Sequence, residues 1–170
     1  STDKRVNEVT KILFGKYPSL DLLSSAKVED IMDIIRSVGT YTRKAKYVLD
    51  ISTKLLEIGG KVPNDRDFLE SLSGVGRKTA NVVLSVLFNE PYMAVDTHIE
   101  RVSKRLGFAS MNDSVYEVEQ KLYKIIPKEM MYKLHHQLLL FGRYHCKAIN
   151  PNCINCKIRD LCNEKRKRLS

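Results

Sequence analysis

The sequence lacks several features that would point to other classes of protein. It has no tryptophan, and no apolar run approaches the roughly 18 residues that a membrane-spanning helix needs. We therefore expect no integral membrane protein. No basic segment followed by an apolar one opens the chain, so we expect no secretion. The expected location is intracellular, in the cytoplasm and associated with the nucleoid if the source is a prokaryote.

Cysteine is missing from most of the chain and then appears four times near its end, at Cys146, Cys153, Cys156 and Cys162. Two disulfides would suit a small secreted domain, whereas clustered thiols in an intracellular basic protein predict one metal site. Thiolates bind soft or borderline metals, and zinc sites usually show two tight cysteine pairs. Only Cys153 and Cys156 form such a pair here. The uneven spacing favours a cubane iron–sulfur cluster, with zinc or disulfides as the alternatives.

The sequence has fewer acidic than basic residues. The 170 residues include 29 Lys and Arg against 20 Asp and Glu, a formal net charge of +9. A surplus of this size favours a polyanionic partner, most often nucleic acid and sometimes an anionic membrane surface. Part of it lies in a basic tail, which suits either contact with phosphates or a solvated terminus. The tail residues are Lys157, Arg159, Lys165, Arg166, Lys167 and Arg168.

Strand-like alternation of apolar and polar residues never persists, and apolar residues recur at spacings of three and four instead. The sequence therefore predicts an all-α fold. Capping residues are expected at Thr2 or Asp3, at Asn64 or Asp65, and at Ser114, which forms a capping-box pattern with Glu117. The expected helices run over approximately residues 3–17, 28–38, 45–56, 65–72, 77–88, 97–106, 115–126 and 128–141.

The first candidate site is the segment Gly74-Val75-Gly76-Arg77-Lys78, which interrupts the helical pattern. Two glycines two positions apart allow a tight turn, and the first backbone N–H groups of the following helix can then bind a phosphate. A nucleic-acid backbone could approach such a turn closely. An ordinary turn between helices, with a solvated lysine, explains the glycines equally well.

The second candidate site is Val95-Asp96-Thr97-His98. Asp96 is predicted to cap the next helix, because aspartate is a preferred N-cap residue. A capping carboxylate stays ionised and fixed, so the same residue could also serve catalysis. His98 on its own is more typical of a packed or capping histidine.

Together these motifs resemble the endonuclease III family of helix-hairpin-helix DNA glycosylases. The stretch Leu72–Arg101 is similar to that family's hairpin and catalytic-aspartate segment, and Cys-x6-Cys-x2-Cys-x5-Cys is similar to its [4Fe–4S] loop. The resemblance covers essentially the whole chain. It implies a two-lobed all-α fold. Residues 1–90 would carry the hairpin (about 72–80), and residues 91–170 would end in the cluster loop (146–162), with the active site between the lobes.

The resemblance also implies roles for particular residues. Lys78 resembles the Schiff-base nucleophile, whose amine the helix N-terminus and Arg77 would activate, and Asp96 resembles the catalytic carboxylate. The four cysteines would hold the [4Fe–4S] cluster. The implied enzyme is a monomeric, bifunctional DNA glycosylase and abasic-site lyase that removes oxidised pyrimidines from double-stranded DNA. The residues expected to contact that DNA are Gly74, Val75, Gly76, Arg77, Thr40 and Lys147.

Two features differ from the family pattern. The family has a further helix and a Gln-containing loop ahead of the position of Ser1, so we expect this chain to be an N-terminally truncated piece of a longer product. Thr40 stands in a loop that commonly offers a leucine wedge to DNA. Two alternatives to the enzyme stay open: a non-catalytic helix-hairpin-helix DNA-binding module, and a metal-stabilised scaffold.

Overall fold

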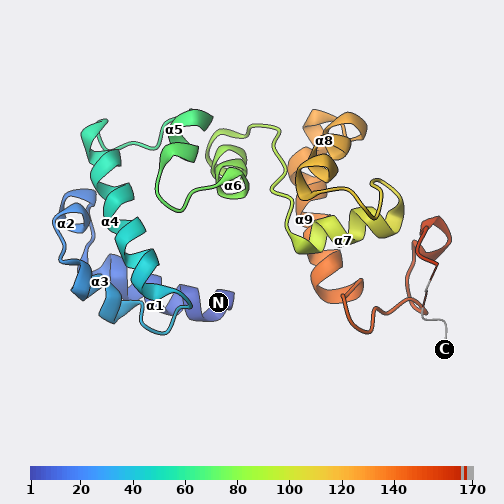
Figure 1. Cartoon of the computed structure of the whole chain (residues 1–170), viewed down its shortest axis with the longest axis horizontal. Helices are drawn as coiled ribbons and strands as arrows, with labels where there is room; N and C mark the ends of the chain where they lie inside the picture. The colour runs from blue at the N-terminus through green and yellow to red at the C-terminus, as the bar shows by residue number, and fades with distance from the viewer. Residues whose placement is uncertain (166, 168–170) are drawn as a thin grey trace. The chain divides into compact units, whose positions relative to one another are not determined.

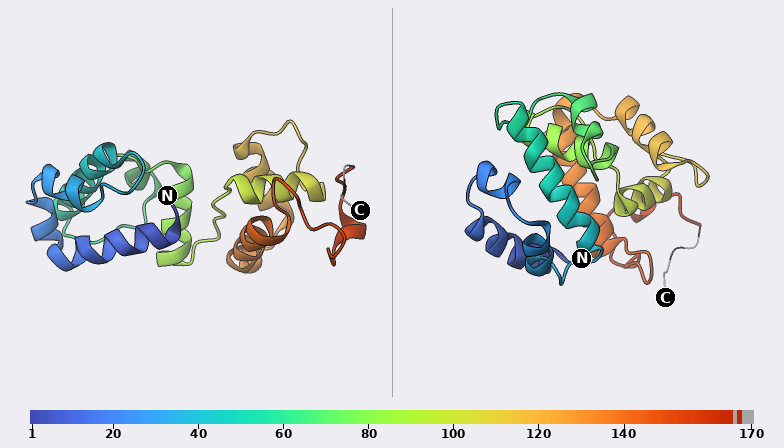
Figure 2. Two further views of the ribbon diagram at one scale, coloured as in Figure 1. Left: turned by 90° about the horizontal axis from the view of Figure 1, so that it is seen from below. Right: turned by 60° about the vertical axis from the view of Figure 1, so that its left-hand side comes forward.

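The computed structural model describes residues 1–165 and 167, so Arg166 and Arg168 of the basic tail lie outside the described residues. Within this part, all regular structure is helical, which confirms the predicted all-α class (Figure 1). The chain forms two compact units, Ser1–Gly76 and Arg77–Ser170. Both consist of helices joined by loops, as the further views also show (Figure 2). No helix of the described part has the length and apolar character needed to cross a bilayer.

The first unit is built around a small apolar core. Its helices are α1 (Asp3–Lys16), α2 (Leu20–Ser24), α3 (Val28–Ile34), α4 (Tyr41–Glu57) and α5 (Arg66–Ser71). The long helix α4 packs against α2 and α3. Thr2 and Asp65 cap α1 and α5 through their side-chain oxygens, as predicted. Ile31 and Ala45 lie at the centre of the core and are fully buried.

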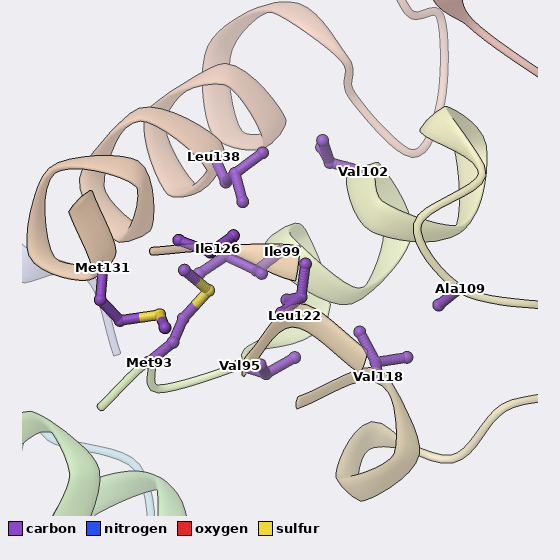
Figure 3. Packing of buried hydrophobic residues seen from close by; sticks show 10 residues of the cluster. All are labelled: Met93, Val95, Ile99, Val102, Ala109, Val118, Leu122, Ile126, Met131 and Leu138. Carbon is purple, nitrogen blue, oxygen red and sulfur yellow. The ribbon is translucent and has the colours of Figure 1, made fainter. Parts of the chain in front are cut away.

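The second unit has a separate core. Its α-helices are α6 (Arg77–Phe88), α7 (Thr97–Leu106), α8 (Val115–Ile125) and α9 (Met131–Leu140). The predicted capping box of Ser114 and Glu117 starts α8, and Gly107 ends α7 in the left-handed conformation at φ 84°. Side chains from α7, α8, α9 and the segments that flank α7 and follow α8 meet in the core (Figure 3). These are Met93, Val95, Ile99, Val102, Ala109, Val118, Leu122, Ile126, Met131 and Leu138.

The last predicted helix is more varied than its sequence pattern indicates. It starts as a 3₁₀ turn over Lys128–Met130, continues as α9, and ends in a π-helical turn over Phe141–His145. Gly142 in this turn lies against α7, where a Cβ atom would come within 3.0 Å of the His98 backbone oxygen. The glycine therefore allows the close approach that carries the chain into the cysteine segment.

The division between the units differs from the boundary expected near residue 90, because α6 belongs to the second unit. Asn81 on α6 is fully buried, and its side-chain amide donates to the Met93 carbonyl at 3.0 Å and to Glu119 Oε2 at 3.1 Å. These bonds hold α6 to α8 and to the segment that precedes α7. Lys78 and Asp96 consequently lie in the same unit.

Candidate active site

The hairpin turn follows α5, and its backbone conformation requires a glycine at position 74. Gly74 has a φ of +76°, a conformation that residues with a Cβ rarely adopt. A Cβ there would also collide with the ring of Tyr47 on α4. At Gly76 a Cβ would meet nothing within 4 Å. The protein itself therefore leaves space at Gly76, which is compatible with the close approach of an external group.

A carboxylate that the sequence analysis did not single out anchors this turn. Asp50 on α4 accepts a hydrogen bond from Ser73 and pairs with Lys54 at 3.2 Å. The bond from Ser73 is the main cause of a lowered pKa for Asp50, and Lys54 adds to it. The residue just before Gly74 is thereby tied to the longest helix of the first unit.

Arg77 and Lys78 open α6, and their side chains have different surroundings. The Arg77 guanidinium donates from Nε to Glu119 Oε1 at 2.9 Å and lies over the Tyr116 ring at 4.9 Å. The Glu119 side chain is only 4% exposed, and its hydrogen bond with Arg77, together with its charge, raises the pKa of Arg77. Lys78 is exposed. Arg77 thus anchors the start of α6, and its contact with DNA stays a prediction.

Asp96 is the N-cap of α7, as predicted. Its Oδ1 accepts the backbone N–H groups of His98 and Ile99, both at 2.9 Å. These bonds fix the carboxylate at the positive end of the helix dipole, where negative charge is stabilised. Oδ2 takes part in neither capping bond. The cap is confirmed and leaves the predicted catalytic role of Asp96 possible.

A histidine on α9, His135, interacts with both Lys78 and Asp96. His135 lies close enough to Asp96 and to Lys78 to interact electrostatically with both. Burial, followed by the neighbouring His136, lowers the pKa of His135, and Asp96 opposes this shift. Its Nδ1 is buried, with no hydrogen-bond partner among the described residues. Sequence analysis missed His135. Its only local signal was that two histidines stand next to each other in the last predicted helix.

A cavity lies between His135 and His136 of α9 and the side chains of α6. It has apolar walls from Val82 and Val86 and polar groups from both histidines of α9. The other lining residues are Asn81, Ser85, Tyr92, Ala94 and Tyr132. Val82 follows Lys78 by one helical turn, so the cavity and the lysine share one face of α6. The second unit therefore combines an amine, a carboxylate, an imidazole and a partly apolar recess.

The four cysteines, Cys146, Cys153, Cys156 and Cys162, line a second cavity together. All four are free thiols, so the structure does not support the disulfide alternative. In the described part of the chain, no three His, Cys, Asp or Glu side chains form a group that could hold a metal ion. Four sulfurs around a shared cavity fit a larger, polynuclear group that takes four thiolates better than they fit one ion.

Two further predicted DNA contacts lie on the surface. Thr40, ahead of α4, is exposed and has a positive φ of 58°, and its hydroxyl donates to the Gly39 carbonyl at 2.6 Å. Lys147 follows the first cysteine and is also exposed. The structure places Gly74, Val75, Gly76 and Thr40 in the first unit and the other predicted site residues in the second.

Similarity to known proteins defines the class of protein to which this chain belongs. The family model for the HhH-GPD superfamily base excision DNA repair protein matches residues 1–128. Among relatives, endonuclease III of Bacillus subtilis is 51% identical over 98% of this chain and 77% of its own. Endonuclease III of Escherichia coli K12 is 44% identical over 98% of this chain and 79% of its own.

Solved structures agree. A trapped endonuclease III–DNA covalent intermediate matches with a TM-score of 0.93 and 51% identity, over 99% of this chain and 80% of the other. A non-covalent endonuclease III–DNA complex matches with a TM-score of 0.91 and 51% identity, over 96% and 77%. The chain belongs to the endonuclease III family of the HhH-GPD superfamily. This membership makes it a DNA glycosylase and lyase of base excision repair, and the non-catalytic module is not favoured.

Proposed function

We propose that Lys78 and Asp96 carry out this activity on oxidised pyrimidines and abasic sites in double-stranded DNA. The observation that carries the proposal is their position in the second unit, where both interact with His135. Lys78 is exposed at the start of α6, and Asp96 is held rigidly at the start of α7. A nucleophilic amine and a fixed anion are the two groups that a covalent glycosylase requires.

The chemistry begins at the sugar. The neutral amine of Lys78 attacks C1′ of the extruded nucleotide while the N-glycosidic bond breaks, and the base leaves with that electron pair and takes up a proton. Positive charge develops on the sugar in this step, and the Asp96 carboxylate stabilises it. The C1′–O4′ bond then breaks, O4′ keeps its electron pair and takes up a proton, and the nitrogen loses its protons, which leaves an imine between Lys78 and C1′.

The imine then permits strand cleavage. Removal of a proton from C2′ forms a C1′–C2′ enamine that expels the 3′ phosphate, which leaves with the electron pair of the C3′–O bond. Water hydrolyses the remaining imine and releases Lys78. We expect the Gly74–Arg77 segment and the positive end of α6 to hold a backbone phosphate during these steps, because the first N–H groups of a helix have no partner within the helix and its dipole favours an anion there.

We further propose that Cys146, Cys153, Cys156 and Cys162 bind a [4Fe–4S] cluster. Their shared cavity supports this assignment, since such a cluster takes four thiolate ligands. When bound, the cluster would supply cross-links within the C-terminal segment, which contains no helix longer than a 3₁₀ turn in the described stretch between Cys146 and Cys162. The proposed partner is duplex DNA at an intracellular location, and the proposed active form is the monomer.

The test uses a 5′-labelled duplex that contains one thymine glycol or one abasic site. The wild-type protein should release the base and cut the strand, leaving the 3′ end that β-elimination produces. Lys78→Ala should lower cleavage to the level without enzyme, whereas Lys124→Ala, a matched exposed lysine of α8, should retain it. Cleavage by Lys78→Ala at the wild-type rate would overturn the proposed role of Lys78. If the wild-type protein cleaves neither duplex, the proposed substrates are wrong.

A further inference from the structure

Arg105 lies in the last turn of α7 and points its guanidinium at the start of the cysteine segment. Nη1 donates to Cys146 Sγ at 3.3 Å and to the Lys147 carbonyl at 2.8 Å, and Nη2 reaches the Ala148 carbonyl at 3.4 Å. One turn earlier, Arg101 donates to the Cys146 carbonyl at 3.1 Å, and within the described residues no hydrogen bond joins it to a cysteine sulfur. Arg105 of α7 thus donates a hydrogen bond to a cysteine side chain.

The same residue holds the other end of the cysteine segment. The Arg105 carbonyl accepts the Asn163 N–H at 2.9 Å and, while Cys162 is a thiol, its S–H at 3.4 Å. Its Nε lies 3.5 Å from the Glu164 carboxylate. The Arg105 side chain is only 16% exposed, and its bonds to Cys146 and Cys162 are partly buried. A single residue therefore ties the first and the last cysteine to one helix.

We infer that Arg105 is a positioning residue that holds the cysteine segment in its binding shape and, through Cys146, raises the reduction potential of the bound cluster. The inference rests on the cluster proposed above. An N–H donated by a cation to a ligand sulfur withdraws electron density from it, which stabilises the reduced cluster. Groups that bond to metal ligands also slow the loss of the metal, because they keep the ligands in place.

Arginine suits this position better than lysine. Its planar guanidinium can donate in several directions at once, and three of its acceptors here belong to consecutive residues, Cys146, Lys147 and Ala148. A lysine would keep the charge but could not match this set of bonds. Substitution by glutamine removes the charge as well. The two variants therefore separate the effect of the charge from that of the geometry.

The experiment compares wild type, Arg105→Gln, Arg105→Lys and the control Arg159→Gln. Arg159 lines the same cavity and carries the same charge, but its side chain pairs with Asp160 at 3.5 Å. Iron and sulfide per chain, the rate of iron loss to a chelator, the midpoint potential by film voltammetry and helicity by circular dichroism are measured for each protein. Activity is not needed for any of these readouts.

We expect Arg105→Gln to lose iron roughly tenfold faster than wild type, as for other partners of metal ligands. Its midpoint potential should be more negative, Arg105→Lys should fall between the two, and Arg159→Gln should resemble wild type. If Arg105→Gln does not fold, Arg105→Lys decides, since wild-type potential and iron retention in that variant would refute the inference.

Two outcomes separate this inference from the proposed function. If wild type holds a cluster and Arg105→Gln behaves like Arg159→Gln in both potential and iron loss, the role of Arg105 is wrong while the cluster stands. If wild-type protein, purified without oxygen, contains no iron and sulfide, the proposed cluster is wrong and the inference fails with it.

Discussion

Replacing Glu119 tests how the start of α6 is held. This carboxylate is 4% exposed and accepts two bonds from Arg77 Nε, at 2.9 and 3.2 Å, and one from buried Asn81 at 3.1 Å. Glu119→Ala would leave the guanidinium and the Asn81 amide without this acceptor. Truncating one partner of a buried ion pair costs about 3–5 kcal/mol. Because the Arg77 side chain is 38% exposed, water recovers part of this, and we expect about 2–3 kcal/mol.

Glu119→Gln is the matched variant, since it keeps the size and one acceptor oxygen and loses only the charge. It should cost less than Glu119→Ala, about 1–2 kcal/mol, the cost of weakening a charged hydrogen bond. The free energy of unfolding is measured by denaturant titration at neutral pH. Strand cleavage, measured below the unfolding range, should fall in both variants because Lys78 follows Arg77 directly. A loss below about 0.5 kcal/mol in Glu119→Ala, the range of ordinary surface substitutions, would refute the anchoring of α6.

Three further predictions concern individual residues. Asp96→Asn keeps the helix cap, so base excision should fall by about 10²-fold, and unfolding should change by less than about 1–2 kcal/mol; a collapse of thermal stability with activity unchanged would mean that Asp96 only caps α7. Gly76→Val should weaken binding to a lesion-bearing duplex with little change in its salt dependence, whereas Lys165→Ala should lower the slope by at most about one unit; equal, small losses would make the hairpin an ordinary turn. The pKa of His135 in the folded protein lies below its ordinary value of 6.5. Near and below pH 6.5 the unfolded chain therefore binds a proton more readily than the folded chain, so the free energy of unfolding should fall as the pH drops below 6.5. His135→Gln should lose less stability than wild type between pH 7.5 and pH 5 in denaturant titrations, and an equal loss would show that His135 is not shielded.

The fold class was predictable because it depends on local signals. Apolar spacing indicated helices, and the caps at Thr2, Asp65, Asp96 and Ser114 were confirmed by their hydrogen bonds. Helix α2 was missed because its five residues make little more than one turn, which is too short for a periodic pattern. The 3₁₀ and π-helical ends of the last predicted helix depend on tertiary contacts, and no local rule indicates them.

The candidate site was only partly predictable. Lys78, Asp96 and the cysteines stand in recognisable local motifs, so their sequence context was enough to single them out. The partner of Arg77 is 42 residues away in the chain, and only the tertiary fold of the second unit brings Glu119 of α8 to it. His135 and Arg105 likewise owe their roles to helix packing. Long-range pairs of this kind decide how a motif is held, and a single sequence does not show them.

The central claim is that the amine of Lys78 forms the covalent bond to DNA, and peptide mapping tests it most directly. The wild-type protein is incubated with an abasic-site duplex and borohydride, which reduces the imine to a stable bond, and the adduct is digested and sequenced by mass spectrometry. The account predicts a sugar remnant on Lys78 and no adduct with Lys78→Ala, although that variant still binds the duplex. A remnant on another lysine, or trapping by Lys78→Ala at the wild-type rate, would contradict it.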